Sequence, residues 1–459
     1  SLLLLDRLIA RTSSLACLLL VTFRPEFRPP WTQFPHVSQV PLQRLGRAET
    51  RELIDQVSGG RPLPEPIVAE IIARTDGVPL FVEELTRAML EAGSAERDPT
   101  AAAPNLLIPS TLNASLMMRL DRLRPETREL AQVAAVLGRE FPLPLIAAVS
   151  SLDAKRLRLA LAELVGSGLL LSRGEPPAIV YGFKHALVQD AAYSSLLRRR
   201  RERLHARIAD VLQSRFVELA APELLGHHYA EAGNAMAAAA SFLEAGLRAS
   251  ARSSNVEAIA HLTRTLSLLG GLNPSAERDA LELRARSALA AARMASDGYA
   301  APDTAAALAA AGELAARIGD HHAQFRSVFW LYTIHYIGAD HAEALRHTNH
   351  AVLLAEADGS ELQRCIAHRM QAAVLNAMGD FVEAERHAGL AQAVYRRDAH
   401  AAYAVDFGHD LGVAALAQRA IATWHLGLPE QAAAITRRAI ELAATLDHAN
   451  TAAYVHFFP

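Results

Sequence analysis

This chain has few cysteines, few aromatic residues and little net charge, and it lacks apolar runs of membrane length. Two cysteines among 459 residues, Cys17 and Cys365, exclude a disulfide framework and fit a reducing cytoplasm. No stretch approaches the roughly 18 apolar residues of a membrane span. Asp6 and Arg7 interrupt the opening leucine run, where a signal peptide would stay apolar. Because the net charge is only −3, nothing attracts the whole chain to nucleic acid or anionic lipid. We therefore expect a cytoplasmic protein with no membrane partner.

Alanine and other apolar residues are abundant instead. Hydrophobic residues make up 51% of the chain and aromatic residues 6%. This balance favours closely packed helices, because alanine loses no side-chain entropy in a helix. The length suggests roughly three domains. We predict a mainly α fold with a small α/β part at the N-terminus, a winged-helix-like middle domain and a C-terminal α-solenoid of tetratricopeptide-like repeats.

The N-terminal part predicts one strand among helices. Leu2–Ala10 has the spacing of a short helix, and the apolar run Ala16–Thr22 is typical of a buried central strand in a parallel sheet. Apolar residues at helical spacing then predict three helices, at Ala48–Val57, Pro64–Arg74 and Leu80–Ala92. A turn at residues 76–79 precedes the last of them, and Gly93–Pro104 has the composition of a linker.

The middle of the chain predicts short helices and then a hairpin. The expected helices are Ser110–Leu123, Pro125–Leu137, Pro142–Val149 and Ala154–Val165, and the expected strands are Leu169–Ser172 and Ile179–Phe183. Three helices followed by a hairpin give the winged-helix layout. A helix at His185–Leu197 follows, and then a basic helix that begins with Arg198–Arg201.

An internal repeat lies in the alanine-rich helices beyond residue 223. The residues Asp340, Glu343, Ala344, Arg346 and His347 recur 40 residues later as Asp380, Glu383, Ala384, Arg386 and His387. Glycine ends one helix in each unit, aspartate begins the next, and small residues allow close packing. A tetratricopeptide period is about 34 residues, so the array is a degenerate one.

Three segments together resemble one family of proteins. Residues 20–27 (LVTFRPEF) look like the strand that carries sensor 1 in STAND ATPases, the signal-transduction ATPases with numerous domains. Residues 75–85 (TDGVPLFVEEL) look like their Gly-x-Pro motif, and residues 183–193 (FKHALVQDAAY) like the end of their winged-helix domain. The order is similar to that of bacterial members that couple the ATPase to tetratricopeptide repeats, often with a class III nucleotide cyclase domain. The resemblance implies the end of an ATPase core with its helical lid at 1–97, a winged-helix-like domain at 108–212 and repeats at 223–459.

The sequence departs from this family in one important respect. It has no Gly-x-x-x-x-Gly-Lys-[Ser/Thr] phosphate loop, so nothing supplies the backbone cradle and the lysine that hold a triphosphate. We expect this chain alone to be non-catalytic and to bind no nucleotide tightly. The resemblance implies ATP or ADP with Mg²⁺ in a full-length parent, which would be an ATPase and could also carry a cyclase domain. Because no initiator methionine opens the sequence, we expect both ends to be cut.

The resemblance implies three nucleotide-contacting residues. Arg24 would approach the terminal phosphate from the end of the sensor strand, or pair locally with Glu26 or Asp6. Pro79 would stack on adenine, or simply form a turn between two helices. His185 would touch the ADP phosphate and hold the winged helix closed, or cap the helix that follows.

Other residues suggest less specific chemistry. We expect no metal site, because His227-His228 and His321-His322 are adjacent pairs whose side chains point to different sides of a helix. Arg198–Arg201 predicts a solvated helix end or an interdomain ion-pair surface more strongly than DNA binding, because no aromatic residue interleaves it.

These observations predict a regulatory, signal-transducing fragment of a nucleotide-dependent switch ATPase. Its helical repeats would bind a protein partner or a small-molecule effector. Two alternatives stay open: a transcription regulator that binds DNA, and the regulatory part of a class III nucleotide cyclase.

Overall fold

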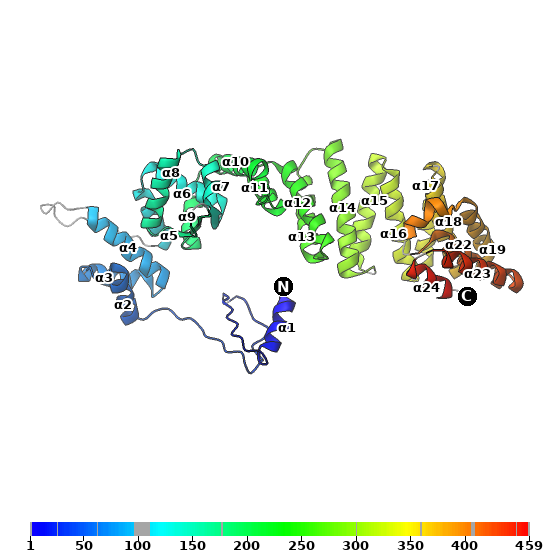
Figure 1. Cartoon of the computed structure of the whole chain (residues 1–459), viewed down its shortest axis with the longest axis horizontal. Helices are drawn as coiled ribbons and strands as arrows, with labels where there is room; N and C mark the ends of the chain where they lie inside the picture. The colour runs from blue at the N-terminus through cyan, green and yellow to red at the C-terminus, as the bar shows by residue number, and fades with distance from the viewer. Residues whose placement is uncertain are drawn as a thin grey trace. The chain divides into compact units, whose positions relative to one another are not determined.

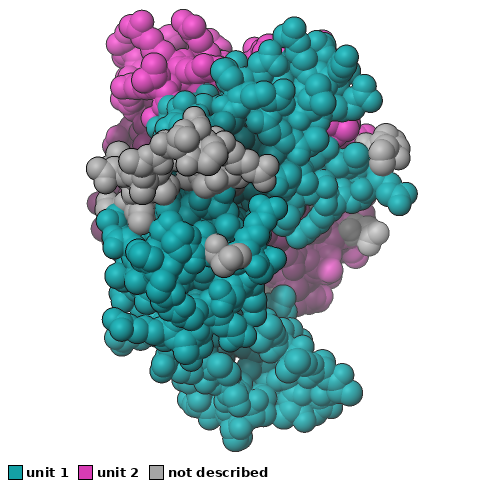
Figure 2. All heavy atoms as spheres, turned by 90° about the vertical axis from the view of Figure 1, so that its left-hand side faces the viewer, with its two compact units in different colours: residues 1–140, 152–195 teal, residues 141–151, 196–459 magenta. Residues whose placement is uncertain are grey.

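The computed structural model describes residues 2–24, 26–61, 63–95, 111–175, 178–299, 301–358, 360–404, 409–446 and 448–457. They form two compact units, which Figure 2 colours separately. Unit 1 comprises residues 1–140 and 152–195, and unit 2 comprises residues 141–151 and 196–459. The three predicted domain ranges stay a prediction.

Helices dominate both units, as the composition predicts (Figure 1). In unit 1 they are α1 (Leu2–Thr12), α2 (Arg47–Ser58), α3 (Glu65–Thr75), α4 (Pro79–Ala95), α5 (Leu112–Arg122), α6 (Pro125–Leu137), α8 (Ala154–Gly166) and α9 (Ala186–Ser194). Most of the predicted linker Gly93–Pro104, and Ser110 at the start of one predicted helix, lie outside the described residues.

The predicted strand at Ala16–Thr22 is wrong. Residues 17–24 form neither a helix nor a strand and pair with no strand in the described part of the chain, and Leu18 and Leu20 are 94% and 84% exposed. A central strand needs hydrogen-bonded neighbours on both edges and covered faces. The described residues of this region supply neither, so the apolar run does not form a strand.

Helices α2, α3 and α4 share one small core. Ile54 of α2, Val68 and Ile71 of α3, and Val82 and Leu85 of α4 are buried together. α4 carries the largest share of it, because its apolar residues recur at intervals of three and four along the helix. This packing fixes which face of α4 turns away from α2 and α3.

The middle of the chain contains the predicted hairpin. β2 (Leu170–Arg173) pairs antiparallel with β3 (Val180–Phe183), with Leu170 opposite Phe183. A strand that the sequence analysis missed, β1 (Glu140–Pro142), joins the sheet in the order β1–β3–β2. It is short, and sequence patterns of three residues carry little periodicity.

Unit 2 is an array of helices in which each packs against the next along the chain (Figure 1). After α7 (Leu143–Val149), its helices are α10 (Arg198–Arg215), α11 (Pro222–Glu231), α12 (Ala235–Ala251), α13 (Asn255–Leu269), α14 (Ala276–Asp297), α15 (Pro302–Ile318), α16 (His321–Ile337), α17 (His341–Asp358), α18 (Glu361–Met378), α19 (Phe381–Val394), α20 (Arg397–His400), the 3₁₀ turn η1 (Ala401–Tyr403), α22 (Leu411–His425), α23 (Pro429–Ala444) and α24 (Ala449–Phe457). No helix in the described residues is long and apolar enough to cross a membrane.

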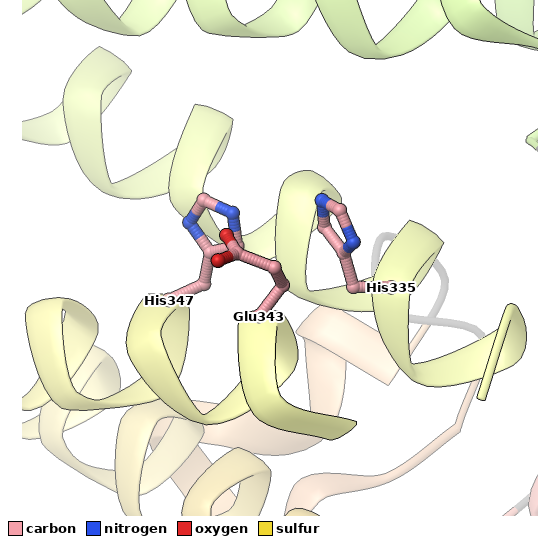
Figure 3. A group of neighbouring side chains, drawn as sticks. All are labelled: His335, Glu343 and His347. Atoms are coloured by element: carbon pink, nitrogen blue, oxygen red, sulfur yellow. The ribbon is translucent and has the colours of Figure 1, made fainter. Parts of the chain in front are cut away.

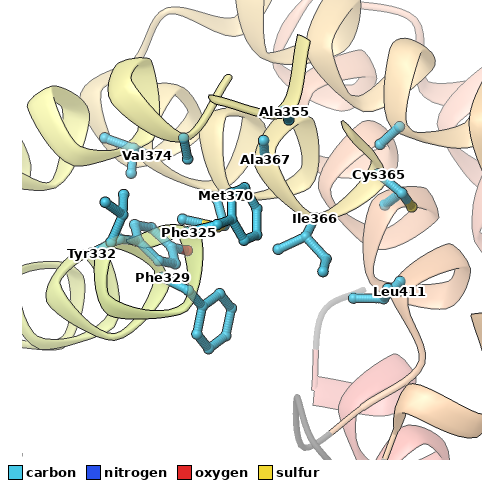
Figure 4. Packing of buried hydrophobic residues seen from close by; sticks show 14 of the residues in the cluster. Phe325, Phe329, Tyr332, Ala355, Cys365, Ile366, Ala367, Met370, Val374 and Leu411 are labelled. Atoms are coloured by element: carbon cyan, nitrogen blue, oxygen red, sulfur yellow. The ribbon is translucent and has the colours of Figure 1, made fainter. Parts of the chain in front are cut away.

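A large buried cluster joins α16, α17, α18 and α22. Figure 4 shows Phe325, Phe329 and Tyr332 of α16 close to Met370 and Val374 of α18. Fully buried alanines of α17 belong to the same cluster, and their small side chains allow the helix axes to approach closely. Three buried aromatic residues of α16 thus belong to the core that this helix shares with α17 and α18.

The internal repeat of the sequence is also a repeat of structure. Asp340 and Asp380 each accept a hydrogen bond from the backbone N–H three residues on, at 3.3 Å in both units. Glu343 pairs with Arg346, as Glu383 pairs with Arg386, each at 2.6 Å. These contacts stabilise the N-terminal ends of α17 and α19, the second helix of each repeat. The two repeats therefore begin these helices with the same local interactions.

Candidate functional site

The Gly-x-Pro segment forms the turn between α3 and α4. Gly77 has a φ of 67°, and its carbonyl accepts a hydrogen bond from the Leu45 amide at 2.8 Å. A Cβ at this position would clash with the Leu45 carbonyl. Arg44 also forms an ion pair with Asp76. The glycine is therefore required by the local close approach of two backbone segments.

Pro79 is the first residue of α4 and is exposed. A proline at a helix start loses nothing, because the first amide has no partner within the helix. The structure thus supplies a local reason for this residue. Its predicted contact with adenine stays a prediction.

Arg24 is exposed and lies outside the helices and strands of the described residues. The amide of Phe27 donates to its carbonyl at 3.0 Å. The ring of Phe27 lies 5.7 Å from that of Phe23 and 5.8 Å from that of Trp31, measured between centroids. Arg24 therefore sits on a turn held by aromatic contacts, not at the end of a sheet strand. Its sensor role stays a prediction without the strand that motivated it.

His185 immediately precedes α9 and is half-buried. Its side chain makes no capping hydrogen bond to that helix, so the local capping alternative has no support. The Nε2 atom is buried and makes no hydrogen bond with any residue that the structure describes. Burial and, secondly, the neighbouring Lys184 lower the pKa of His185 below 6.5. The ring is therefore neutral near pH 7.

A carboxylate of α4 meets the segment that contains His185. Glu83 accepts hydrogen bonds from Lys184 and, at 3.1 Å, from Arg87. Its second oxygen lies 3.8 Å from Nε2 of His185. Burial alone would raise the pKa of Glu83, but the hydrogen bond from Lys184 and the charges of both cations outweigh it and lower that pKa. The Gly-x-Pro helix and the FKHALVQDAAY segment thus meet at a charged junction.

A second carboxylate of α4 lies deeper in unit 1. Glu84 pairs with Arg119 of α5, and their side chains are 0% and 1% exposed. Arg119 also donates to the carbonyl of Ser167, at the end of α8. Arg122 donates to the carbonyl of Ala88 in α4 at 2.8 Å. We call Glu83, Glu84, Lys184, His185 and Arg119 the α4 junction.

The sequence analysis placed Glu83 and Glu84 in the Gly-x-Pro segment but assigned them no role. A signal was present: two adjacent carboxylates interrupt the apolar stretch of a helix, which requires buried partners. The partners themselves were not visible, because Lys184 is 101 residues from Glu83 and Arg119 is 35 residues from Glu84.

A pocket of about 490 Å³ lies between α5 and α9 in unit 1. Its lining includes Thr111, Leu116, Leu187 and Asp190, and none of the described residues that line it is basic. A phosphate group requires positive charge or several donors. The pocket offers the hydroxyls of Thr111 and Ser194 and the side-chain amide of Asn113 as donors, beside the carboxylate of Asp190.

In the basic run at the start of α10, Arg198, Arg199 and Arg200 are exposed, whereas Arg201 is partly buried. Arg198 is exposed and pairs with Glu202 at 2.9 Å. Further along the helix, Arg207 donates to the carbonyl of Ser150 in the same unit at 3.3 Å. These contacts fit a helix end with local ion pairs, and they give DNA binding no specific support.

Comparisons with known proteins give a related sequence of greater length. No family model matches the chain. It is 27% identical over 453 residues to an uncharacterised protein of Rhizobium meliloti (strain 1021), a match that covers 95% of this chain and 43% of the relative. The chain thus spans less than half the length of the relative that it matches.

Two solved structures resemble the chain weakly. One is a STAND protein with a tetratricopeptide repeat sensor from Pyrococcus horikoshii, at 12% identity and a TM-score of 0.39, covering 94% of this chain and 72% of that one. The other is aspartyl phosphate phosphatase F from Bacillus subtilis, at 10% identity and a TM-score of 0.34, covering 89% and 88%. Both scores are too low to carry an argument, so the helical-repeat architecture rests on the helices and contacts described above.

Proposed function

We propose that this chain is the regulatory and interaction segment of a nucleotide-dependent switch ATPase. In this proposal unit 1 responds to the nucleotide, and the helical repeats of unit 2 bind a protein or a small-molecule effector. The observation that carries it is the α4 junction, where the helix that begins at Pro79 meets the segment that contains His185. These are two of the three segments whose sequences resemble the switch ATPases.

The spacing on α4 supports a common binding edge. Pro79 and Glu83 are four residues apart, so their side chains lie on the same face of the helix, about one turn from each other. Glu83 contacts Lys184 and approaches His185. A nucleotide whose base stacked on Pro79 would thus have its phosphates directed toward residues that can donate hydrogen bonds.

The state of His185 suits a phosphate contact. A neutral imidazole with its proton on Nε2 can donate to an incoming phosphate without first breaking another bond, because no described residue makes a hydrogen bond with that atom. Lys184 can share its charge between Glu83 and the phosphate. The junction would then tighten around a diphosphate and hold the segment before α9 against α4.

Nucleotide affinities of a His185→Ala variant test this proposal. The assay uses the gene product in which the chain is joined to a phosphate loop, as the resemblance implies. Loss of a charge-assisted hydrogen bond made only in the closed state should weaken ADP binding roughly ten-fold or more. The affinity for ATP should change less, and calorimetry measures both.

A matched control lies in unit 2. His261 is also partly buried and also lies 3.8 Å from a glutamate, Glu257. His261→Ala should leave both nucleotide affinities unchanged. Equal weakening of ADP and ATP by His185→Ala, or no change in either, would refute the nucleotide contact.

A further inference from the structure

Three potential metal ligands meet between α16 and α17 in unit 2. His335 lies in the last turn of α16, and Glu343 and His347 lie in the first two turns of α17. One nitrogen or oxygen atom from each of the three lies within 4.8 Å of the other two. Figure 3 shows the carboxylate of Glu343 beside the ring of His347, with His335 approaching from the neighbouring helix.

Helix geometry explains why these side chains converge. Glu343 and His347 are four residues apart, so they lie on one face of α17. The ring of His335 stacks against that of His347, with centroids 5.3 Å apart and an angle of 27° between the planes. The two helices pack side by side, which holds the third ligand opposite the first two.

Neighbouring charges orient two of the three groups. Asp340 lies 3.4 Å from Nδ1 of His335, which leaves Nε2 of that ring for another partner. Arg346 holds the Oε2 atom of Glu343, at 2.8 and 2.6 Å from its Nε and terminal nitrogen, and leaves Oε1 available. Carboxylates that fix the orientation of a ligand histidine are typical of metal sites. Arg346 also lies 3.4 Å from Nε2 of His347, a long contact that an ion can replace.

The second repeat unit shows that this cluster is not a by-product of the repeat. Asp380, Glu383, Arg386 and His387 reproduce the start of the helix, but Leu375 occupies the position equivalent to His335. There His387 pairs instead with His368, with Nδ1 atoms 2.9 Å apart. Only the first of the two repeats therefore has a histidine, His335, to serve as the third ligand.

We propose that His335, Glu343 and His347 form a binding site for a divalent transition-metal ion of the Zn²⁺ class. Two imidazoles and one carboxylate are a common ligand set for Zn²⁺, with water in the fourth position. Ligand atoms on a tetrahedral Zn²⁺ are about 3.3 Å apart, so atoms that now lie within 4.8 Å of one another would approach by up to about 1.5 Å when an ion binds. A bound ion would fasten the end of α16 to the start of α17.

Burial of His347 favours such binding. His347 is 7% exposed, and the packing of α16 against α17 holds its ring beside that of His335. The sequence analysis considered only adjacent histidines, which is why it expected no metal site and did not notice the pair at 343 and 347.

Zinc titration of the purified chain tests the site. Calorimetry with Zn²⁺ at pH 7.5, and the visible absorption of Co²⁺ as a geometry probe, should report one site per chain with tetrahedral coordination. His335→Leu introduces the residue that the second repeat has at the equivalent position, Leu375. Glu343→Gln keeps the shape of the half-exposed glutamate side chain and removes its charge. Each should weaken Zn²⁺ binding by about ten-fold or more.

Glu383→Gln in the second of the two repeats is the matched control. This variant removes the equivalent carboxylate from the repeat that has Leu375 in place of the third ligand, so Zn²⁺ affinity should not change. Thermal melts of the metal-free variants separate lost binding from lost folding. Two results would overturn the proposal: no saturable binding by the wild-type chain at 100-fold excess of Zn²⁺, or equal affinities of the wild type and the folded Glu343→Gln variant.

Discussion

The buried pair Glu84–Arg119 gives a stability prediction with a clear magnitude. Both side chains are essentially inaccessible to water, and Arg119 also donates to the carbonyl of Ser167. Glu84→Gln keeps the shape and one hydrogen-bond acceptor but leaves the guanidinium without its buried counter-charge. Removal of one partner of a buried pair costs about 3–5 kcal/mol. We expect the lower end, about 3 kcal/mol, because the glutamine oxygen and Ser167 still accept hydrogen bonds.

The matched control is an exposed pair in the same region. Arg156 and Glu126 lie 3.1 Å apart, with side chains 61% and 52% exposed. Exposed pairs contribute between 0 and about 1 kcal/mol, so Glu126→Gln should change the stability of unit 1 by no more than about 1 kcal/mol. This pair separates the effect of burial from that of charge loss.

A double variant tests the reasoning itself. If the cost of Glu84→Gln arises from the uncompensated charge of Arg119, then Arg119→Met should restore most of the lost stability when combined with it. Because the chain forms two units, unfolding in urea should be monitored by hydrogen exchange of the α4 and α5 amides, which reports the stability of unit 1 separately from that of unit 2. Equal destabilisation by Glu84→Gln and Glu126→Gln, or no recovery in the double variant, would refute the reasoning.

Two further predictions concern the repeats. Ala384 is completely buried, so Ala384→Glu should lower the free energy of unfolding by several kcal/mol. Ala434→Glu on the exposed face of α23 should change that free energy by about 0.5 kcal/mol or less, and thermal melts of the two variants test the difference. His205 and His228 are both 1% exposed with Nδ1 atoms 2.8 Å apart, and their pKa values fall from 6.5 to about 4 and about 3, mainly through burial. Because these folded-state pKa values lie below the unfolded one, stability is complete above pH 6.5 and falls as pH drops toward 4. Changing His228 to Leu should reduce that slope by about 1.4 kcal/mol per pH unit near pH 5, and an unchanged slope in urea unfolding at several pH values would contradict it.

Most helices could be predicted from the sequence, because their signals are local. Pro125–Leu137 was expected with the bounds that α6 has, since proline begins the helix and glycine follows it. The hairpin of β2 and β3 was expected to within one residue at most ends, owing to the turn-forming residues between two apolar runs. The strand at Ala16–Thr22 failed for the opposite reason: a strand depends on partners elsewhere in the chain, which composition does not reveal.

The candidate site divides in the same way. His185 and Pro79 were identified by resemblance, which reads each motif separately. The contact of Glu83 with Lys184 depends on tertiary packing over 101 residues, and no spacing rule reaches that far. The Glu343–His347 pair, in contrast, was within reach of an i, i+4 search along a predicted helix.

The two equivalent repeat units show where new chemistry can arise in such an array. Their second helices begin alike, with the same capping aspartate and the same glutamate–arginine pair. What differs is the side chain contributed by the neighbouring helix: His335 in one unit and Leu375 in the other. A single substitution there leaves capping and close packing intact, because both are supplied by other residues. A repeat can therefore keep its fold while the contact between its two helices changes from an apolar one to a candidate metal site.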